Sequence, residues 1–289
     1  ASFYSIFAAE LPTVQVVDYY SLADEVINGN KERERTASLK MSREFMVFLE
    51  NEGNSIEPEF KDITYRDDVI VSADMLTERF LSDTENTTKA RGERLNAFAQ
   101  NVIEEYFSEN HKSIYRAIDD ESSISDDTEK LLKAEKRDVK AKTMEMIKTA
   151  TVLDPVAVYF RLLGKFAEKK CDNSLLDTAR TLQQGYVEFE DALGIVYLKS
   201  ILGTCAVLSG VKHILIDEAQ DLSLIQHEIL KKMFPRARVT LLADTNQAIV
   251  AGINTVDTQA LAKLYDAKIM VLDRSYRSTQ EINTFACKL

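Results

Sequence analysis

The stretch ILIDEAQD, residues 214–221, decides how the chain is interpreted. Its apolar residues, Ile214 to Ile216, form a short run typical of a strand buried on both faces of a parallel sheet. Asp217 and Glu218 follow directly, at the strand's carboxyl end, which is the edge where α/β folds bind ligands. One carboxylate there can hold Mg²⁺ while its neighbour polarises the water that attacks a γ-phosphate. An isolated Asp-Glu pair can also simply begin a helix, because acidic groups favour a helix N-terminus.

Two more apolar runs, 239–242 and 269–272, are also followed by polar residues. Gln247 follows the first run, and its uncharged amide can hydrogen-bond a γ-phosphate or the attacking water. Arg277 and Tyr276 follow the second run, where the guanidinium can neutralise charge in a transition state and the ring can stack on a base. Three such runs with helical segments between them predict a parallel α/β sheet.

Together the three strand ends resemble motifs II, III and IV of the UvrD/Rep-type superfamily 1 helicases. The family's strings are close to DEAQD, GDxxQxI and LxxNYRS, and this chain reads DEAQD, ADTNQAI and LDRSYRS. Ala243 replaces the family's glycine and Ser275 its asparagine, which affects loop geometry more than the assignment. The resemblance implies a motor that uses ATP and Mg²⁺ and acts on nucleic acid.

The resemblance also implies roles for individual residues. Asp217 corresponds to the Mg²⁺ ligand and Glu218 to the catalytic base. Gln247 corresponds to the γ-phosphate sensor and Arg277 to the arginine finger. The other residues implied to bind the nucleotide are Gln220, Asp221 and the adenine-stacking Tyr276.

Looser strings upstream resemble the HelD-like branch, bacterial ATPases that associate with RNA polymerase and help to free it from nucleic acid. These strings lie at residues 38–45, 60–63, 69–72 and 189–192. The resemblance implies RNA polymerase as a partner. The alternative is that these are ordinary packing residues of some other helical insertion.

Outside the three strand runs the chain is mainly helical. Residues 62–71 predict a hairpin, and 14–17 predicts another parallel strand. The expected fold class is α/β: an incomplete RecA-like (P-loop NTPase) parallel sheet with a large, mainly α-helical insertion that contains a small β-hairpin. The expected boundaries are 1–35 for the first part of motor domain 1, 36–202 for the insertion, 203–272 for the second part of motor domain 1, and 273–289 for the link to motor domain 2.

Two long helices are expected over residues 89–118 and 128–150, with the acidic loop 119–127 between them. One face of the second helix carries six cations, which are Lys130, Lys133, Lys136, Arg137, Lys140 and Lys142. Such a cluster could contact phosphates, but the interleaved Glu135 and Asp138 favour a solvated helix face.

Composition narrows the function classes. The formal charge of −11 argues against a broad surface for nucleic acid, because phosphate binding uses Lys and Arg. A narrow basic groove is still compatible with this charge. Three cysteines far apart indicate neither a disulfide framework nor a metal site. No run approaches the ~20 apolar residues of a membrane span, and no signal peptide is visible, so we expect a cytoplasmic protein without membrane contact.

No GxxxxGK[ST] phosphate-binding loop occurs in the sequence. The simplest interpretation is an internal piece of a longer motor that begins after that loop and ends before motifs V and VI. This piece alone is expected neither to hydrolyse ATP nor to unwind DNA.

Three functions are left open. The favoured one is a HelD-type ATPase that remodels complexes of RNA polymerase with nucleic acid, and the second is a DNA helicase of the UvrD/Rep or helicase IV kind that moves along single-stranded DNA. The insertion separates these two, since a DNA-tracking insertion should present a basic groove. The third is a binding module that has lost its ATPase function, which an intact DEAQD argues against.

Overall fold

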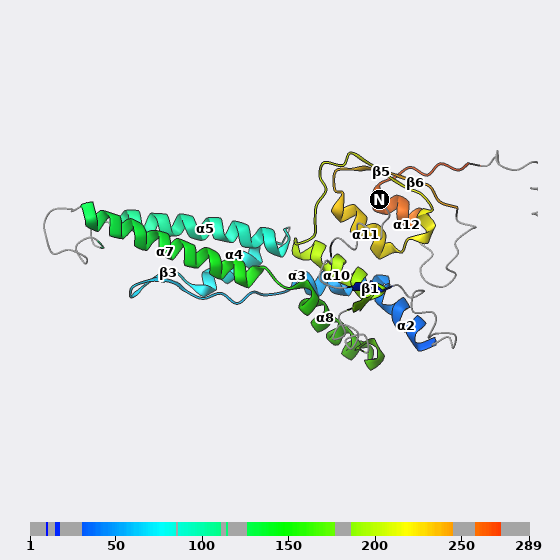
Figure 1. Ribbon diagram of the computed structural model, residues 1–289, viewed down its shortest axis with the longest axis horizontal. Coiled ribbons are helices and arrows are strands. Elements are labelled where there is room, and N and C mark those ends of the chain that lie inside the picture. Colours follow the sequence, from blue (N-terminus) through cyan, green and yellow to red (C-terminus); the bar gives the residue numbers. More distant parts are fainter. Residues whose placement is uncertain are drawn as a thin grey trace, which may run out of the picture.

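The computed structural model describes residues 10, 15–17, 31–84, 86–110, 114, 126–176, 186–244 and 258–272 of the chain. Over these ranges it is a mixed α/β fold, mostly helical with small sheets (Figure 1). Its elements form a helical body, a long arm that projects from the body, and a layer that contains strands β5 and β6. None of the described helices is long and apolar enough to span a bilayer.

The body packs around one central helix. Its elements are β1 (Gln15–Val17), α2 (Lys31–Lys40), α3 (Arg43–Asn54), α8 (Pro155–Lys170), the 3-10 helix η2 (Asn173–Leu176), β4 (Tyr186–Glu188) and α10 (Phe189–Leu202). Every residue of α10 from Glu190 to Leu198 is buried, so apolar residues cover all sides of this helix. A helix that is apolar all round is typical of a core element rather than of a surface one.

The strand predicted at residues 14–17 is confirmed as β1, which pairs in parallel with β4. Gln15 lies opposite Tyr186, and Val17 lies opposite Glu188. The sequence did not predict β4, because this strand is three residues long and continues directly into α10, which leaves no periodicity of its own.

A buried ionic cluster joins α2, α8 and α10. Lys40 Nζ lies 2.9 Å from Asp191 Oδ1, and the Tyr159 hydroxyl donates to the same oxygen at 2.7 Å. All three side chains are almost entirely buried. Burial, together with the Asp191 carboxylate, raises the pKa of Tyr159 well above its usual value. Removing one partner of such a pair would leave an uncompensated buried charge, which costs about 3 to 5 kcal/mol.

The arm has its own core. Its elements are β2 (Ile63–Tyr65), β3 (Asp68–Val71), α4 (Ala73–Ser82), α5 (Thr88–Glu109) and α7 (Asp126–Thr151). Helices α5 and α7 lie side by side along the arm, with the hairpin and α4 against them (Figure 1). The buried residues at its centre include Phe80, Leu95, Ile103, Phe107 and Ile147. The predicted hairpin is confirmed, since β2 and β3 pair antiparallel.

The first arm helix is shorter than predicted. Helix α5 ends at Glu109 instead of residue 118, with Asn110 as its C-cap. The Asn110 amide donates to the Tyr106 carbonyl at 3.0 Å and so satisfies a carbonyl at the helix end. The second predicted helix is confirmed as α7, while the acidic loop 119–127 falls largely outside the described residues.

Four of the six cations named on α7 are paired with acids. Lys136 and Lys140 both bind Glu104 of α5, and their hydrogen bonds lower the pKa of Glu104 to about 2. Lys133 pairs with Glu129, and Lys142 with Asp138, one helical turn away in each case. These contacts are those of a solvated helix face whose charges are compensated, as the interleaved acids predicted.

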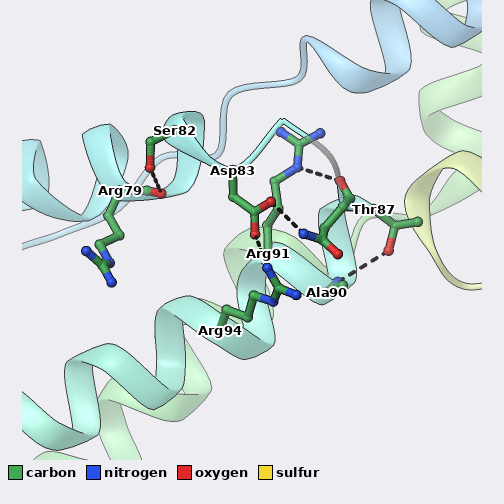
Figure 2. Close-up of polar contacts among 8 residues, drawn as sticks. Arg79, Ser82, Asp83, Thr87, Ala90, Arg91 and Arg94 are labelled. Atoms are coloured by element: carbon green, nitrogen blue, oxygen red, sulfur yellow. Dashed lines mark hydrogen bonds and ion pairs between the residues drawn. The ribbon is translucent and has the colours of Figure 1, made fainter.

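Figure 2 shows the root of the arm, where α4 turns into α5 next to the body. The buried guanidinium of Arg91 donates from Nε to the Asn86 carbonyl at 2.8 Å and from a terminal nitrogen to the Asn54 carbonyl at 3.4 Å. The guanidinium carbon of Arg91, Cζ, lies 5.2 Å from the centroid of the Phe80 ring. Arg91 therefore links the arm core to the end of α3 in the body.

Two glycines allow close contacts at the root. A Cβ at Gly92 would lie 2.3 Å from Thr151 Oγ1, so the start of α5 and the end of α7 approach too closely for a side chain. Gly203, at φ 79°, ends α10, and a Cβ there would lie 2.3 Å from Oγ1 of Thr87, the N-cap of α5. The first contact closes the base of the arm, and the second holds that base against the body.

The third group lies beyond α10. It contains β5 (His213–Ile216), the 3-10 helix η3 (Ala219–Asp221), α11 (Leu224–Met233), β6 (Arg238–Leu241) and α12 (Thr258–Tyr265). Strands β5 and β6 are parallel, with Ile216 opposite Leu241. Ile214 and Ile216 face the body core, while Leu215 is 65% exposed on the other face.

The sheet differs from the single buried sheet that was predicted. Among the described residues, β1 pairs with β4 and β5 pairs with β6, as separate two-stranded sheets. The predicted strand 269–272 is not in a strand, and its apolar side chains are exposed. A parallel strand is buried on both faces only when helices cover both, and in the described ranges helices cover one face of β5 and β6.

Candidate functional site

The turn after β5 carries the two candidate carboxylates. Asp217 and Glu218 are both exposed, and the backbone of Glu218 has φ 50° and ψ 43°, in the left-handed region. This conformation costs a residue with a side chain about 1 to 3 kcal/mol and persists where its surroundings enforce it. The Glu218 N–H donates to Asp217 Oδ1 at 3.1 Å, and the Asp221 N–H donates to the Glu218 carbonyl at 2.9 Å.

Gln220 connects the ends of the two strands. Its Nε2 donates to Glu218 Oε2 at 2.7 Å, and its Oε1 accepts the N–H of Asp244 at 3.0 Å. Only this orientation of the amide works, because a carboxylate only accepts and a backbone N–H only donates. The buried Gln220 therefore fixes the Glu218 carboxylate and the backbone that leaves β6.

The structure brings four predicted site residues together and leaves three untested. Asp217, Glu218, Gln220 and Asp221 lie in one turn, with Gln220 buried beneath the exposed acids. The predicted sensor Gln247, adenine-stacking Tyr276 and arginine finger Arg277 lie outside the described residues. Their convergence on the carboxylates, and all seven roles, stay predictions.

Asp217 suits a Mg²⁺ ion that arrives with a nucleotide. One carboxylate oxygen, Oδ1, accepts the Glu218 N–H, which leaves Oδ2 for a metal. Within the described ranges no three His, Cys, Asp or Glu side chains gather closely enough to hold a metal. Mg²⁺ commonly uses one or two carboxylates together with waters and substrate phosphates, and a single exposed Asp fits that pattern.

One residue beneath the turn was not predicted. His227 of α11 is fully buried, and its Nε2 lies 3.0 Å from the carbonyl oxygen of Ala219. In the sequence it is a lone histidine in an amphipathic helix, and such a residue is usually an ordinary part of the core. Only the fold shows that this ring meets the backbone of the DEAQD turn.

The family comparison covers both the arm and this turn. A family model described as the UvrD/REP helicase N-terminal domain matches residues 46–251, well over half of the chain. A comparison with curated proteins gave no match. The matched range includes Asp217 and Glu218, while Tyr276 and Arg277 lie beyond it. The motifs, the parallel strands and the matched range together show that this chain belongs to the UvrD/REP helicase N-terminal domain family.

Proposed function

We propose that the chain is part of a nucleic acid-dependent motor in which Asp217 holds Mg²⁺ and Glu218 is the base that activates water for ATP hydrolysis. UvrD-like helicases in general use ATP with Mg²⁺, and the family supports such a parent protein. The observation that carries the proposal is the turn after β5. It presents two adjacent carboxylates at a strand end and holds Glu218 in a strained backbone conformation.

The hydrogen bonds of the turn suit a base that must not rotate. Gln220 occupies Oε2 of Glu218, which leaves Oε1 to accept a proton from the attacking water. Mg²⁺, when bound with ATP, would neutralise negative charge on the phosphates. Asp217 would orient that ion through its free oxygen, and the exposure of both acids leaves room for the nucleotide.

The remaining roles belong to the same proposal. Gln247 senses the γ-phosphate, Arg277 stabilises the transition state, and Tyr276 stacks on adenine. Gln220 and Asp221 complete the nucleotide-binding turn. The RecA-like arrangement and the domain boundaries at residues 35, 202 and 272 are part of the same proposal. Residues 36–202 contain the arm and parts of the body.

For the partner we propose RNA polymerase bound to nucleic acid, as in HelD-like proteins. The arm supports this choice over tracking along DNA. An open groove between β2 and α7 is lined by three cations, Lys61, Arg66 and Lys142, and by three acids, Asp62, Glu135 and Asp138. A groove with balanced charge gains little from a polyanion, because nucleic acid binding depends on an excess of Lys and Arg. A DNA helicase of the UvrD/Rep kind is the alternative.

Replacing the proposed base tests the ATPase. In the full-length protein that contains this chain, Glu218→Gln should lower kcat by about 10²- to 10⁴-fold, because the general base is lost while the shape is kept. Steady-state ATP hydrolysis measures this effect. Glu145→Gln, at an exposed glutamate on α7, should leave kcat unchanged. Full turnover by Glu218→Gln would rule the role out.

The 289-residue chain alone is expected to be inactive. Without a phosphate-binding loop, no part of its sequence cradles the β- and γ-phosphates. The same hydrolysis assay applied to the purified chain should give only background. Turnover by the chain that disappears in Glu218→Gln would contradict this expectation.

Deleting the arm separates the two partner classes. The full-length protein should bind purified RNA polymerase, and replacing residues 60–150 by a short linker should abolish binding while single-stranded DNA binding changes little. The opposite result, lost DNA binding that is steeply salt-dependent in the intact protein, would favour the DNA helicase.

A further inference from the structure

His227 links two helices to the candidate base. It lies on α11, and its Nδ1 is 3.1 Å from the hydroxyl of Tyr265 on α12, while its Nε2 reaches Ala219 at 3.0 Å. The Tyr265 hydroxyl also donates to the His227 carbonyl at 3.0 Å, and the two rings meet edge to face with centroids 5.7 Å apart. The imidazole therefore has a polar partner on each nitrogen.

The partners determine which nitrogen carries the proton. The Ala219 carbonyl can only accept, so Nε2 of His227 must be the donor. Burial lowers the pKa of His227, which keeps the ring neutral at pH 7 and leaves a lone pair on Nδ1. The single proton of the Tyr265 hydroxyl is shared between this lone pair and the His227 carbonyl, so Tyr265 holds the ring in place while the Ala219 carbonyl sets its tautomer.

Ala219 is held on both sides, directly after the strained residue. Its N–H donates at 2.9 Å to the carbonyl of Leu242, the residue that follows β6, and its carbonyl accepts from His227. The first bond orients the peptide that follows Glu218, and the second orients the peptide from which Gln220 departs. Both peptides influence the position of the Glu218 carboxylate, because one follows Glu218 and the other leads to Gln220, whose side chain donates to Glu218 Oε2.

We propose that His227 is a positioning residue that acts through the Ala219 carbonyl to hold the Glu218 carboxylate where it activates the water that attacks ATP. This inference rests on the proposed function. Tyr265 assists by holding the imidazole ring in place. His227 is fully buried beneath the turn, so its role is geometric.

The first test is hydrogen exchange of the turn in the 289-residue chain, which requires no ATPase activity. His227→Phe fills the space but removes the donor, so amides of residues 217–222 should exchange about tenfold faster or more. His227→Gln keeps a donor for Ala219 and an acceptor for Tyr265, so it should restore protection. Ile229→Val, at a buried neighbour on α11, controls for loosened packing and should leave the turn protected. Unchanged exchange in His227→Phe would overturn the proposal.

The second test is steady-state ATP hydrolysis by the full-length protein. His227→Phe should lower kcat by about 10- to 100-fold, because small misplacements of a reacting group are costly, with KM for ATP nearly unchanged. His227→Gln should recover most of kcat, and Tyr265→Phe should lower it less than His227→Phe does. A merely structural role would lower the melting temperature without this split between kcat and KM.

The Glu218→Gln variant separates two kinds of failure. If Glu218→Gln is inactive and His227→Phe keeps full kcat, only the role of His227 is wrong. If Glu218→Gln keeps its turnover, the proposed function is wrong, and the proposed role of His227 in catalysis is then wrong as well. Loss of kcat in both His227→Phe and His227→Gln would also contradict positioning through a single donor.

Discussion

The arm and the β5–β6 layer bury their apolar side chains in different ways. The arm surrounds a closed core of its own, with Ile103 and Leu95 buried between α5, α7 and the hairpin. The layer covers one face of a two-stranded sheet and leaves Leu215 exposed on the other. All the residues of the arm core thus come from one continuous stretch of the chain. In the layer, by contrast, one face of the sheet is covered by helices that are distant in sequence, and the strained turn follows the end of β5.

The largest effect is expected from a cavity in the arm core. Ile103→Ala removes a fully buried side chain and should cost about 2 to 5 kcal/mol through lost burial and a cavity. If the arm is independent, hydrogen exchange should rise in α5, α7 and the hairpin while α10 and α11 stay protected. Val102→Ala, at the half-buried neighbour, should have a much smaller effect. Equal loosening of the body would show that the two cores fold as one unit.

A smaller effect is expected at the root of the arm. Arg91→Ala removes hydrogen bonds to the carbonyls of Asn86 and Asn54, and should cost about 2 kcal/mol, since bonds from charged donors contribute about 1.5 to 3 kcal/mol. Thermal unfolding measures the loss, and exchange should rise at the end of α3. Arg94→Ala is the matched control, because Arg94 makes an exposed ion pair with Asp83 and should change stability by less than about 1 kcal/mol.

The smallest effect is expected on the open face of the layer. Leu215→Thr should change the free energy of unfolding of this chain by less than about 0.5 kcal/mol, because the side chain is already exposed. Ile216→Thr, one residue along on the covered face, should cost about 2 to 3 kcal/mol. Denaturant unfolding of the two variants measures both. Similar costs at the two positions would mean that both faces of β5 are covered.

The sequence predicted what depends on local order. The hairpin around residues 66–68, helix α7 and strand β1 each carry their own periodicity or turn residues, and all three are present. The placement of Asp217 and Glu218 directly after β5 follows in the same way, because a short apolar run followed by acids needs no distant partner.

What the sequence missed depends on distant contacts. The partner of β1, the exposure of residues 269–272 and the contact of His227 with Ala219 are all set by elements that meet only in the folded chain. The left-handed backbone of Glu218 belongs here too, because nothing in the string DEAQD marks a conformation that is usual for glycine. The end of α5 was missed for a local reason, the capping amide of Asn110.

The contacts at the root have a consequence for how such chains can diversify. Asn54, where the chain leaves the body, and Thr151, where it returns, both touch the first turns of α5 through Arg91 and Gly92. Two attachment points this close can be bridged by a short loop, and the entropy of closing a loop grows slowly with its length. The segment between these two points can therefore change in length, or be exchanged for another, while the carboxylate turn stays untouched.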